Sequence, residues 1–173
     1  MTADWTHPLR LHELSRGPVR LSLSPDAATR AAIAKTLGLE GLPQLTAEVA
    51  VRPWLDGAEV EGRFRAIVEQ VCSVSLEPFE QPLEGAFQVR ALPAGSQNAP
   101  AEPGREMELD LDAPDPPDVL EGDAIDLAGY VVEHLALDID PFPRKPGAEF
   151  DYSPPADTDS PFAALAKLKD PKP

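Results

Sequence analysis

Alternating apolar and polar residues predict two short strands at the start of the chain. Residues 9–14 and 18–23 change character at every second position, and in the second segment Val19, Leu21 and Leu23 alternate with polar residues. A period of two is expected of strands that bury only one face. We therefore expect the chain to open with two strands.

A helix is predicted over residues 25–37. Ser24 supplies an N-cap, Pro25 suits the first helical position, and Asp26 places an acid in the first turn. Gly38 follows where a left-handed C-cap would fall. These local signals indicate both ends of the helix.

The middle of the chain reads as a β-hairpin with a definite register. Asp56-Gly57 is a strong signal for a two-residue turn, and this turn would pair residues whose numbers sum to 113. The expected apolar pairs are Leu45/Val68, Ala47/Ala66, Val49/Phe64 and Val51/Gly62. The expected charged pairs on the opposite face are Glu48/Arg65 and Arg52/Glu61. A slip by one residue would expose the apolar set, so the two faces support each other.

Later segments complete the predicted architecture. Residues 82–91 alternate as a further strand, and Asp123 and Asp126 open a helix over about 124–138 that ends before two prolines. We predict an α+β fold in which an antiparallel meander of about five to six strands packs with two helices. Shorter elements are expected at 106–112, as an edge strand, and at 161–169, as a short helix.

The charge of the chain is concentrated in one stretch. The 173 residues carry 30 acidic and 15 basic side chains, for a net charge of −15. Residues 102–140 hold 13 of the acids and one basic residue, Arg105. We expect a single domain over 1–140, with 93–118 as a long exposed loop rich in acid and proline, and a mostly disordered tail over 141–173.

The charge distribution excludes a broad basic grip on nucleic acid, which requires clustered lysine and arginine. The first 35 residues carry a small positive excess, and their arginines form the only local candidate for an RNA or partner contact. These candidates are Arg10, Arg16, Arg20 and Arg30. Four arginines in such a span are also common on ordinary surfaces, and that alternative stays open.

Little in the sequence points to catalysis or to a bound cofactor. Cys72 is the single cysteine, which excludes an intramolecular disulfide and a multi-cysteine zinc site. Inert packing is the more frequent role of such a cysteine. For His134, within the second predicted helix, a hydrogen-bonded or solvent-facing side chain without a catalytic role is likewise the expected interpretation. We expect no metal, cofactor or small-molecule substrate. No apolar run reaches the roughly 18–20 residues that span a bilayer, and no export signal is evident, so we expect a cytoplasmic protein without membrane contact.

Four segments carry a family resemblance. Cys72-Ser-Val-Ser75-Leu76-Glu77-Pro78-Phe79 closes a strand in mid-chain, Asp123-Ala-Ile125-Asp126-Leu127 opens a helix, Leu135-Ala-Leu137 leads to a proline-rich exit, and 161–169 is a Phe- and Lys-bearing segment near the C-terminus. In this order they resemble the YceD family of bacterial proteins, in the form found in its alphaproteobacterial branch. Many members carry a second cysteine where this chain has Ser75 and a further pair near the C-terminus. The zinc site plausible in those relatives therefore does not carry over to this chain.

The resemblance implies a non-enzymatic role in the accumulation or processing of large-subunit (23S) ribosomal RNA. The direct partner would be a ribosomal protein or a pre-ribosomal particle, with a possible contact to rRNA through the N-terminal basic region. Two alternatives stay open. One is an acidic protein-interaction module unrelated to ribosomes, docking through Phe162, Leu165 and Leu168. The other is a small enzyme that uses Cys72 or His134.

Overall fold

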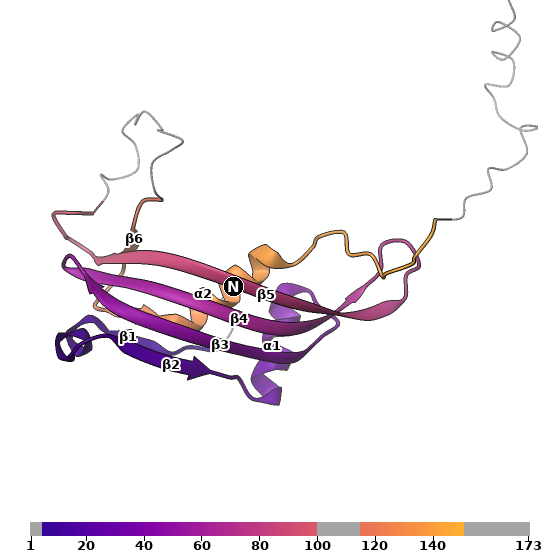
Figure 1. The fold of residues 1–173 in the computed structure, drawn as a ribbon, viewed down its shortest axis with the longest axis horizontal. Coiled ribbons are helices and arrows are strands. Elements are labelled where there is room, and N and C mark those ends of the chain that lie inside the picture. Colours follow the sequence, from indigo (N-terminus) through magenta and orange to yellow (C-terminus); the bar gives the residue numbers. More distant parts are fainter. Residues whose placement is uncertain (1–4, 100–114, 151–173) are drawn as a thin grey trace, which may run out of the picture.

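The computed structural model describes residues 5–99 and 115–150 and shows the α+β fold that the sequence predicts (Figure 1). The elements, in chain order, are β1 (Pro8–Arg10), the 3-10 helix η1 (Leu11–Arg16), β2 (Val19–Leu23), α1 (Ala27–Leu37), β3 (Gly41–Trp54), β4 (Gly57–Val71), β5 (Pro78–Pro93), β6 (Asp118–Leu120), β7 (Ala124–Asp126) and α2 (Leu127–Asp138). The predicted segments 106–112 and 161–169 lie outside the described residues.

Five strands form one sheet in the order β2-β3-β4-β5-β6, and β1 pairs separately with β7. The first four strands are antiparallel neighbours, which confirms the predicted meander. The fifth differs, because β6 joins β5 in parallel, with Ala91 opposite Asp118 and Pro93 opposite Leu120. Both end residues of the expected exposed loop over 93–118, Pro93 and Asp118, are thus part of the sheet.

The two helices pack on one face of this sheet, as Figure 1 shows. Alternate residues of β3 and β4 point to that face and are almost fully buried, among them Val51, Val60, Phe64 and Val68. Ile33 of α1 and residues Leu127, Val131 and Leu135 of α2 complete the core. The opposite face of β2–β5 carries mostly charged side chains, and no described helix covers it; we call it the open face.

The hairpin register was wrong by two residues, although the assignment of faces was right. Trp54 pairs with Gly57, so the two-residue turn is Leu55-Asp56 and paired numbers sum to 111. The glycine serves a different purpose from the expected one. A Cβ atom at position 57 would collide with the carbonyl oxygen of Ala91, so Gly57 allows β5 to approach β4 closely. Leu55 takes the positive φ of the turn instead, at 52°.

This register changes the predicted charge pairs as well. Glu48 lies opposite Arg63, and Arg65 forms its ion pair with Glu84 of β5, at 3.2 Å. Arg52 does pair with Glu61, at 2.8 Å, but along a diagonal of the ladder. A shift of two residues keeps every side chain on its face and exchanges only its neighbours.

The first of the two predicted N-terminal strands differs from expectation, because only Leu9 and Arg10 of the segment 9–14 are extended. Residues 11–16 form a 3-10 helix, because the spacing of Leu11 and Leu14 by three residues suits one side of such a turn and buries Leu14. The strand over 18–23 is confirmed as β2.

The helices begin later than predicted. Asp26 caps α1 by accepting a 2.8 Å hydrogen bond from the Thr29 amide, so Ser24 is not the N-cap, while Gly38 has the expected left-handed conformation. The second helix begins at Leu127, because residues 124–126 are extended and pair with β1 as β7.

Candidate functional site

The four candidate arginines do not form one surface. Arg10 contacts Asp123 at 3.4 Å, and Arg16 is exposed at the end of η1. Arg30 is used inside the fold, because its guanidinium donates to the carbonyls of Pro25 and Leu42. Arg20 lies on the open face opposite Ala50, about 25 Å along β3 from Leu42 at the usual rise per residue. A common phosphate contact by all four is therefore not supported.

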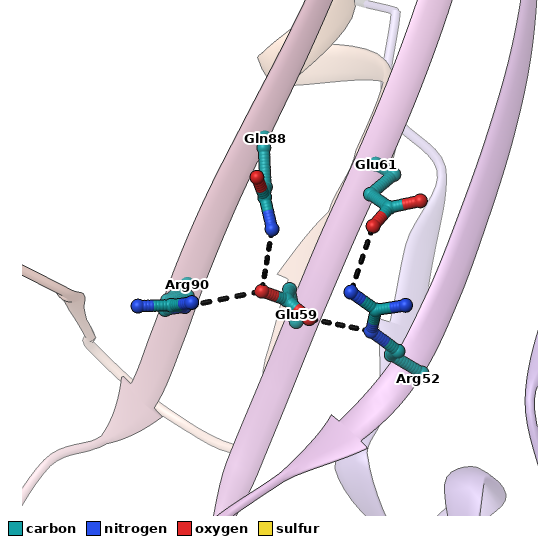
Figure 2. Close-up of polar contacts among 5 residues, drawn as sticks. All are labelled: Arg52, Glu59, Glu61, Gln88 and Arg90. Carbon is teal, nitrogen blue, oxygen red and sulfur yellow. Dashed lines mark hydrogen bonds and ion pairs between the residues drawn. The ribbon is translucent and has the colours of Figure 1, made fainter. Parts of the chain in front are cut away.

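The open face instead contains a polar cluster that sequence analysis missed (Figure 2). Its centre is Glu59 of β4, which is only 4% exposed although it lies on the uncovered face. Arg52 of β3 donates to it at 2.5 Å, and Gln88 and Arg90 of β5 donate at 2.6 and 3.1 Å. The three neighbours reach Glu59 from both adjacent strands, so the cluster ties β3, β4 and β5 together.

The charges in this cluster are mutually satisfied. The hydrogen bond from Arg52 is the main cause that lowers the pKa of Glu59, and the same contact raises the pKa of Arg52. Arg90 also lies over the ring of Trp54, with its guanidinium carbon 5.1 Å from the ring centroid. With its donors and acceptor paired in this way, the cluster is explained by sheet stability and requires no ligand.

The segment that carries the family resemblance forms a tight loop between β4 and β5. The amide of Cys72 donates to the carbonyl of Glu77, and the amide of Leu76 donates to the carbonyl of Cys72, both at 2.9 Å. Pro78 and Phe79 follow as the first residues of β5. We call residues 72–77 the Cys72 loop.

Residues after α2 return to brace this loop. The amide of Ser73 donates to the carbonyl of Pro143 at 2.8 Å, and the ammonium group of Lys145 binds Glu77 at 2.8 Å. Segments that are about 70 residues apart in sequence thus meet here. Residues 143–145, which fall in the region that we expected to be a tail, contribute to the described fold.

The thiol of Cys72 lies in a nest of backbone amides. It accepts from Val74 and Ser75 at 3.4 Å and from Lys145 at 3.3 Å, and the residue is fully buried. The hydrogen bonds from Ser75, followed by the amide of Lys145, lower the pKa of Cys72 to about 6. The loop therefore stabilises a thiolate.

A zinc ion does not fit these residues. Zinc requires about four ligands, and the loop offers one thiolate, with Ser75 at the position that holds a second cysteine in many relatives. The third hydrogen-bond donor to the sulfur is the backbone amide of Lys145, and the side chain of Lys145 adds positive charge nearby. Within residues 5–99 and 115–150, no group of three potential ligands is arranged to hold a metal.

Leu76 is the unusual residue of the loop. Its φ is 59°, in the left-handed region that leucine rarely adopts, and its side chain is 76% exposed. Glycine or asparagine would suit this backbone conformation better, and contact with solvent does not stabilise an exposed leucine side chain. A strained and exposed apolar side chain is a candidate contact for a partner.

The second family segment has a structural role. Ile125 and Leu127 are fully buried in the core. Asp126 accepts a 2.7 Å hydrogen bond from the amide of His7, and the amide of Leu127 donates to the carbonyl of His7. This segment fastens the N-terminal strand β1 to the start of α2.

His134 has partners that explain its position without catalysis. Its ring stacks on Phe87 with centroids 4.3 Å apart, and its Nδ1 atom lies 2.9 Å from the carbonyl of Tyr130. Tyr130 in turn donates to Asp118 at 2.8 Å, and burial is the main cause that raises its pKa. Cys72 and His134 each contact other groups, and no hydrogen bond joins these two described residues.

Comparisons with known proteins give one match. A family model described as "Large ribosomal RNA subunit accumulation protein YceD" matches residues 60–169, from near the start of β4 to near the end of the given sequence. Searches of curated proteins and of solved structures gave no match. None of the described helices is long and apolar enough to cross a membrane.

Proposed function

The chain belongs to the YceD family, and from this premise we propose that it is a non-enzymatic factor in ribosome biogenesis that supports the accumulation or processing of large-subunit (23S) rRNA. The match over residues 60–169 carries the proposal, because the family is named for that role. We place its action in the cytoplasm, where ribosomes are assembled. The proposed direct partner is a ribosomal protein or a pre-ribosomal particle.

The charge and the placement of the arginines support a protein partner over direct binding of rRNA. A net charge of −15 repels a phosphate backbone, and the four N-terminal arginine candidates are dispersed or used inside the fold. Basic proteins, in contrast, are attracted to an acidic surface.

Depletion of the protein in its native host tests the proposal. Total RNA should show a lower ratio of large-subunit to small-subunit rRNA, and re-expression of the wild-type protein should restore it. An unchanged ratio under verified depletion would remove the proposed role and leave the acidic interaction module as the better account.

Leu76 offers a sharper test, because Leu55 is a matched control. Both are exposed leucines with a positive φ, at 59° and 52°. The Leu76→Asn and Leu55→Asn variants should both fold at least as stably as wild type, since asparagine tolerates this conformation. We expect only Leu76→Asn to fail to restore the rRNA ratio. Full rescue by Leu76→Asn would show that the exposed leucine contacts no essential partner.

A further inference from the structure

A groove of about 490 Å³ lies between β5, the residues that lead into β6, and α2. Residues 88–90 of β5 form one wall, and Asp115 and Asp118 lie near the start of β6. Tyr130, Glu133 and His134 of α2 form the other wall. The Tyr130–Asp118 hydrogen bond and the stack of His134 on Phe87 hold these walls in place.

The rim of the groove is acidic. Asp115 and Glu133 are exposed and have no ion-pair partner in the described part of the chain. Arg90 is the one lysine or arginine among the lining residues, and its guanidinium is already bonded to Glu59. Residues 115–140 as a whole contain eight acids and no lysine or arginine. The groove therefore favours a positively charged occupant.

An exposed apolar side chain also borders the groove. Leu137 of α2 is 75% exposed and is among the lining residues. Its position beside uncompensated acids suits a segment that carries both cationic and aliphatic side chains.

The groove opens onto an edge of β5 that the described residues leave mostly unpaired. Of the described residues, only β6 pairs with the outer edge of β5, and it covers only Ala91–Pro93. The ladder between β4 and β5 runs without a bulge, so alternate residues of β5 direct their backbone groups outward. Pro78 and Pro82 belong to this outward set, where a missing N–H costs no ladder bond.

The same alternation places further residues in the outward set, and those between Pro82 and the part paired with β6 include Glu84, Ala86 and Gln88, which retain their amides. Their N–H and C=O groups are available to an added strand. The two prolines block strand addition at the far end of β5 and leave the end beside the groove open. An extended peptide would thus meet backbone partners and acidic side chains at one place.

We propose that this edge and groove, formed by β5, residues 115–118 and α2, bind an extended polypeptide segment rich in lysine or arginine, which adds as a strand to β5. The inference rests on the proposed function for its biological meaning, because it specifies the chemistry of the protein partner.

A binding assay on the purified full-length protein tests this proposal. The probe is a fluorescein-labelled peptide of alternating lysine and valine, and the control is the same peptide with glutamate in place of lysine. Fluorescence anisotropy should show saturable binding of the lysine peptide, weakened by salt, and none of the glutamate peptide. Equal binding of both peptides, binding of neither, or displacement of the lysine peptide by a single-stranded RNA oligonucleotide that occupies the same groove would overturn the proposal.

Two pairs of variants locate the binding site. Asp115→Lys with Glu133→Lys should weaken binding by about tenfold, whereas Glu40→Lys with Glu48→Lys, an equal change of charge at exposed positions outside the groove, should not. Gln88→Pro removes an outward amide and should abolish binding. Gln88→Ala retains that amide and loses the same side-chain contact with Glu59, so it should bind the lysine peptide where Gln88→Pro does not. Unchanged binding by the groove pair or by Gln88→Pro would overturn the proposed mode.

These measurements need no ribosomal phenotype. If the peptide does not bind but depletion of the protein still lowers the ratio of large-subunit to small-subunit rRNA, only the proposed binding groove is rejected. Peptide binding without any effect of depletion on rRNA would reject the ribosomal role alone.

Discussion

Replacement of Glu59 by glutamine probes the polar cluster that joins the three central strands. The substitution keeps the size of the side chain but removes the charge that Arg52 and Arg90 share. It also places an amide donor where the carboxylate accepts from three groups. The variant should therefore fold with the same sheet and lower stability.

The expected loss of stability in Glu59→Gln follows from how deeply Glu59 and its two arginine partners are buried. A hydrogen bond to a charged group contributes about 1.5–3 kcal/mol, whereas an exposed ion pair contributes at most about 1 kcal/mol. Glu59 is 5% exposed at its side chain, but Arg52 and Arg90 are 53% and 36% exposed and regain water when the charge is lost. We expect Glu59→Gln to lower the free energy of unfolding by about 2 kcal/mol and the Tm by roughly 4–8 °C.

The matched control is Glu61→Gln in the same cluster. Glu61 is 49% exposed and makes one ion pair, with Arg52. Its replacement should cost less than about 0.5 kcal/mol. Urea unfolding of both variants, followed by circular dichroism, measures the difference.

The stability difference should also depend on pH. Because its pKa is lowered in the fold, mainly by Arg52, Glu59 contributes stability above its unfolded pKa of about 4.3 and loses it as the pH falls through the folded pKa. The gap between wild type and Glu59→Gln should be full at neutral pH and should close in acid. Equal stability of the two glutamine variants, or a gap that persists at low pH, would refute this account of the cluster.

Three further predictions concern the loop at Cys72 and the turn between β3 and β4. The amides around Cys72 should lower the pKa of its thiol to about 6 in the folded protein, against about 8.5 in the unfolded chain. The contribution of Cys72 to folding stability should therefore grow as the pH rises between these two values. Ultraviolet absorbance of the thiolate, with Cys72→Ser as the blank, should show the midpoint near 6, and a midpoint above 8 would contradict the role of the amides. Gly57→Ala should destabilise the protein by more than about 2 kcal/mol, because the added methyl group meets the backbone of Ala91. Leu55→Asn should instead stabilise it by about 0.5–1 kcal/mol by relieving the positive φ. Thermal melts compare the two variants, and a Gly57→Ala variant as stable as wild type would contradict the close approach of Ala91 to Gly57.

The features that the sequence predicted well are those set by neighbouring residues. The C-terminal end of α1 was located because Gly38 acts within one turn, and the buried faces of β3 and β4 followed from a period of two. The hairpin register failed because Gly57 satisfies a contact with Ala91, which lies 34 residues further along the chain. A local signal cannot distinguish a glycine required by a turn from one required by a neighbouring strand.

The candidate sites depend on contacts between distant segments, and this limited their prediction. Cys72 and Leu76 were singled out by resemblance, but the bracing by Pro143 and Lys145 and the strained φ of Leu76 emerge only in the fold. The cluster around Glu59 requires three strands in register. The acidic groove likewise needs β5, β6 and α2 side by side, and no spacing within one segment encodes it.

Pulse labelling of RNA in cells depleted of the protein tests the central claim most directly. If the protein supports the accumulation of large-subunit rRNA, labelled large-subunit rRNA should be made at a normal rate and then decline during the chase, while small-subunit rRNA persists. Expression of the wild-type protein should restore both to equal persistence. Equal persistence of the two rRNAs without the protein would contradict the claim.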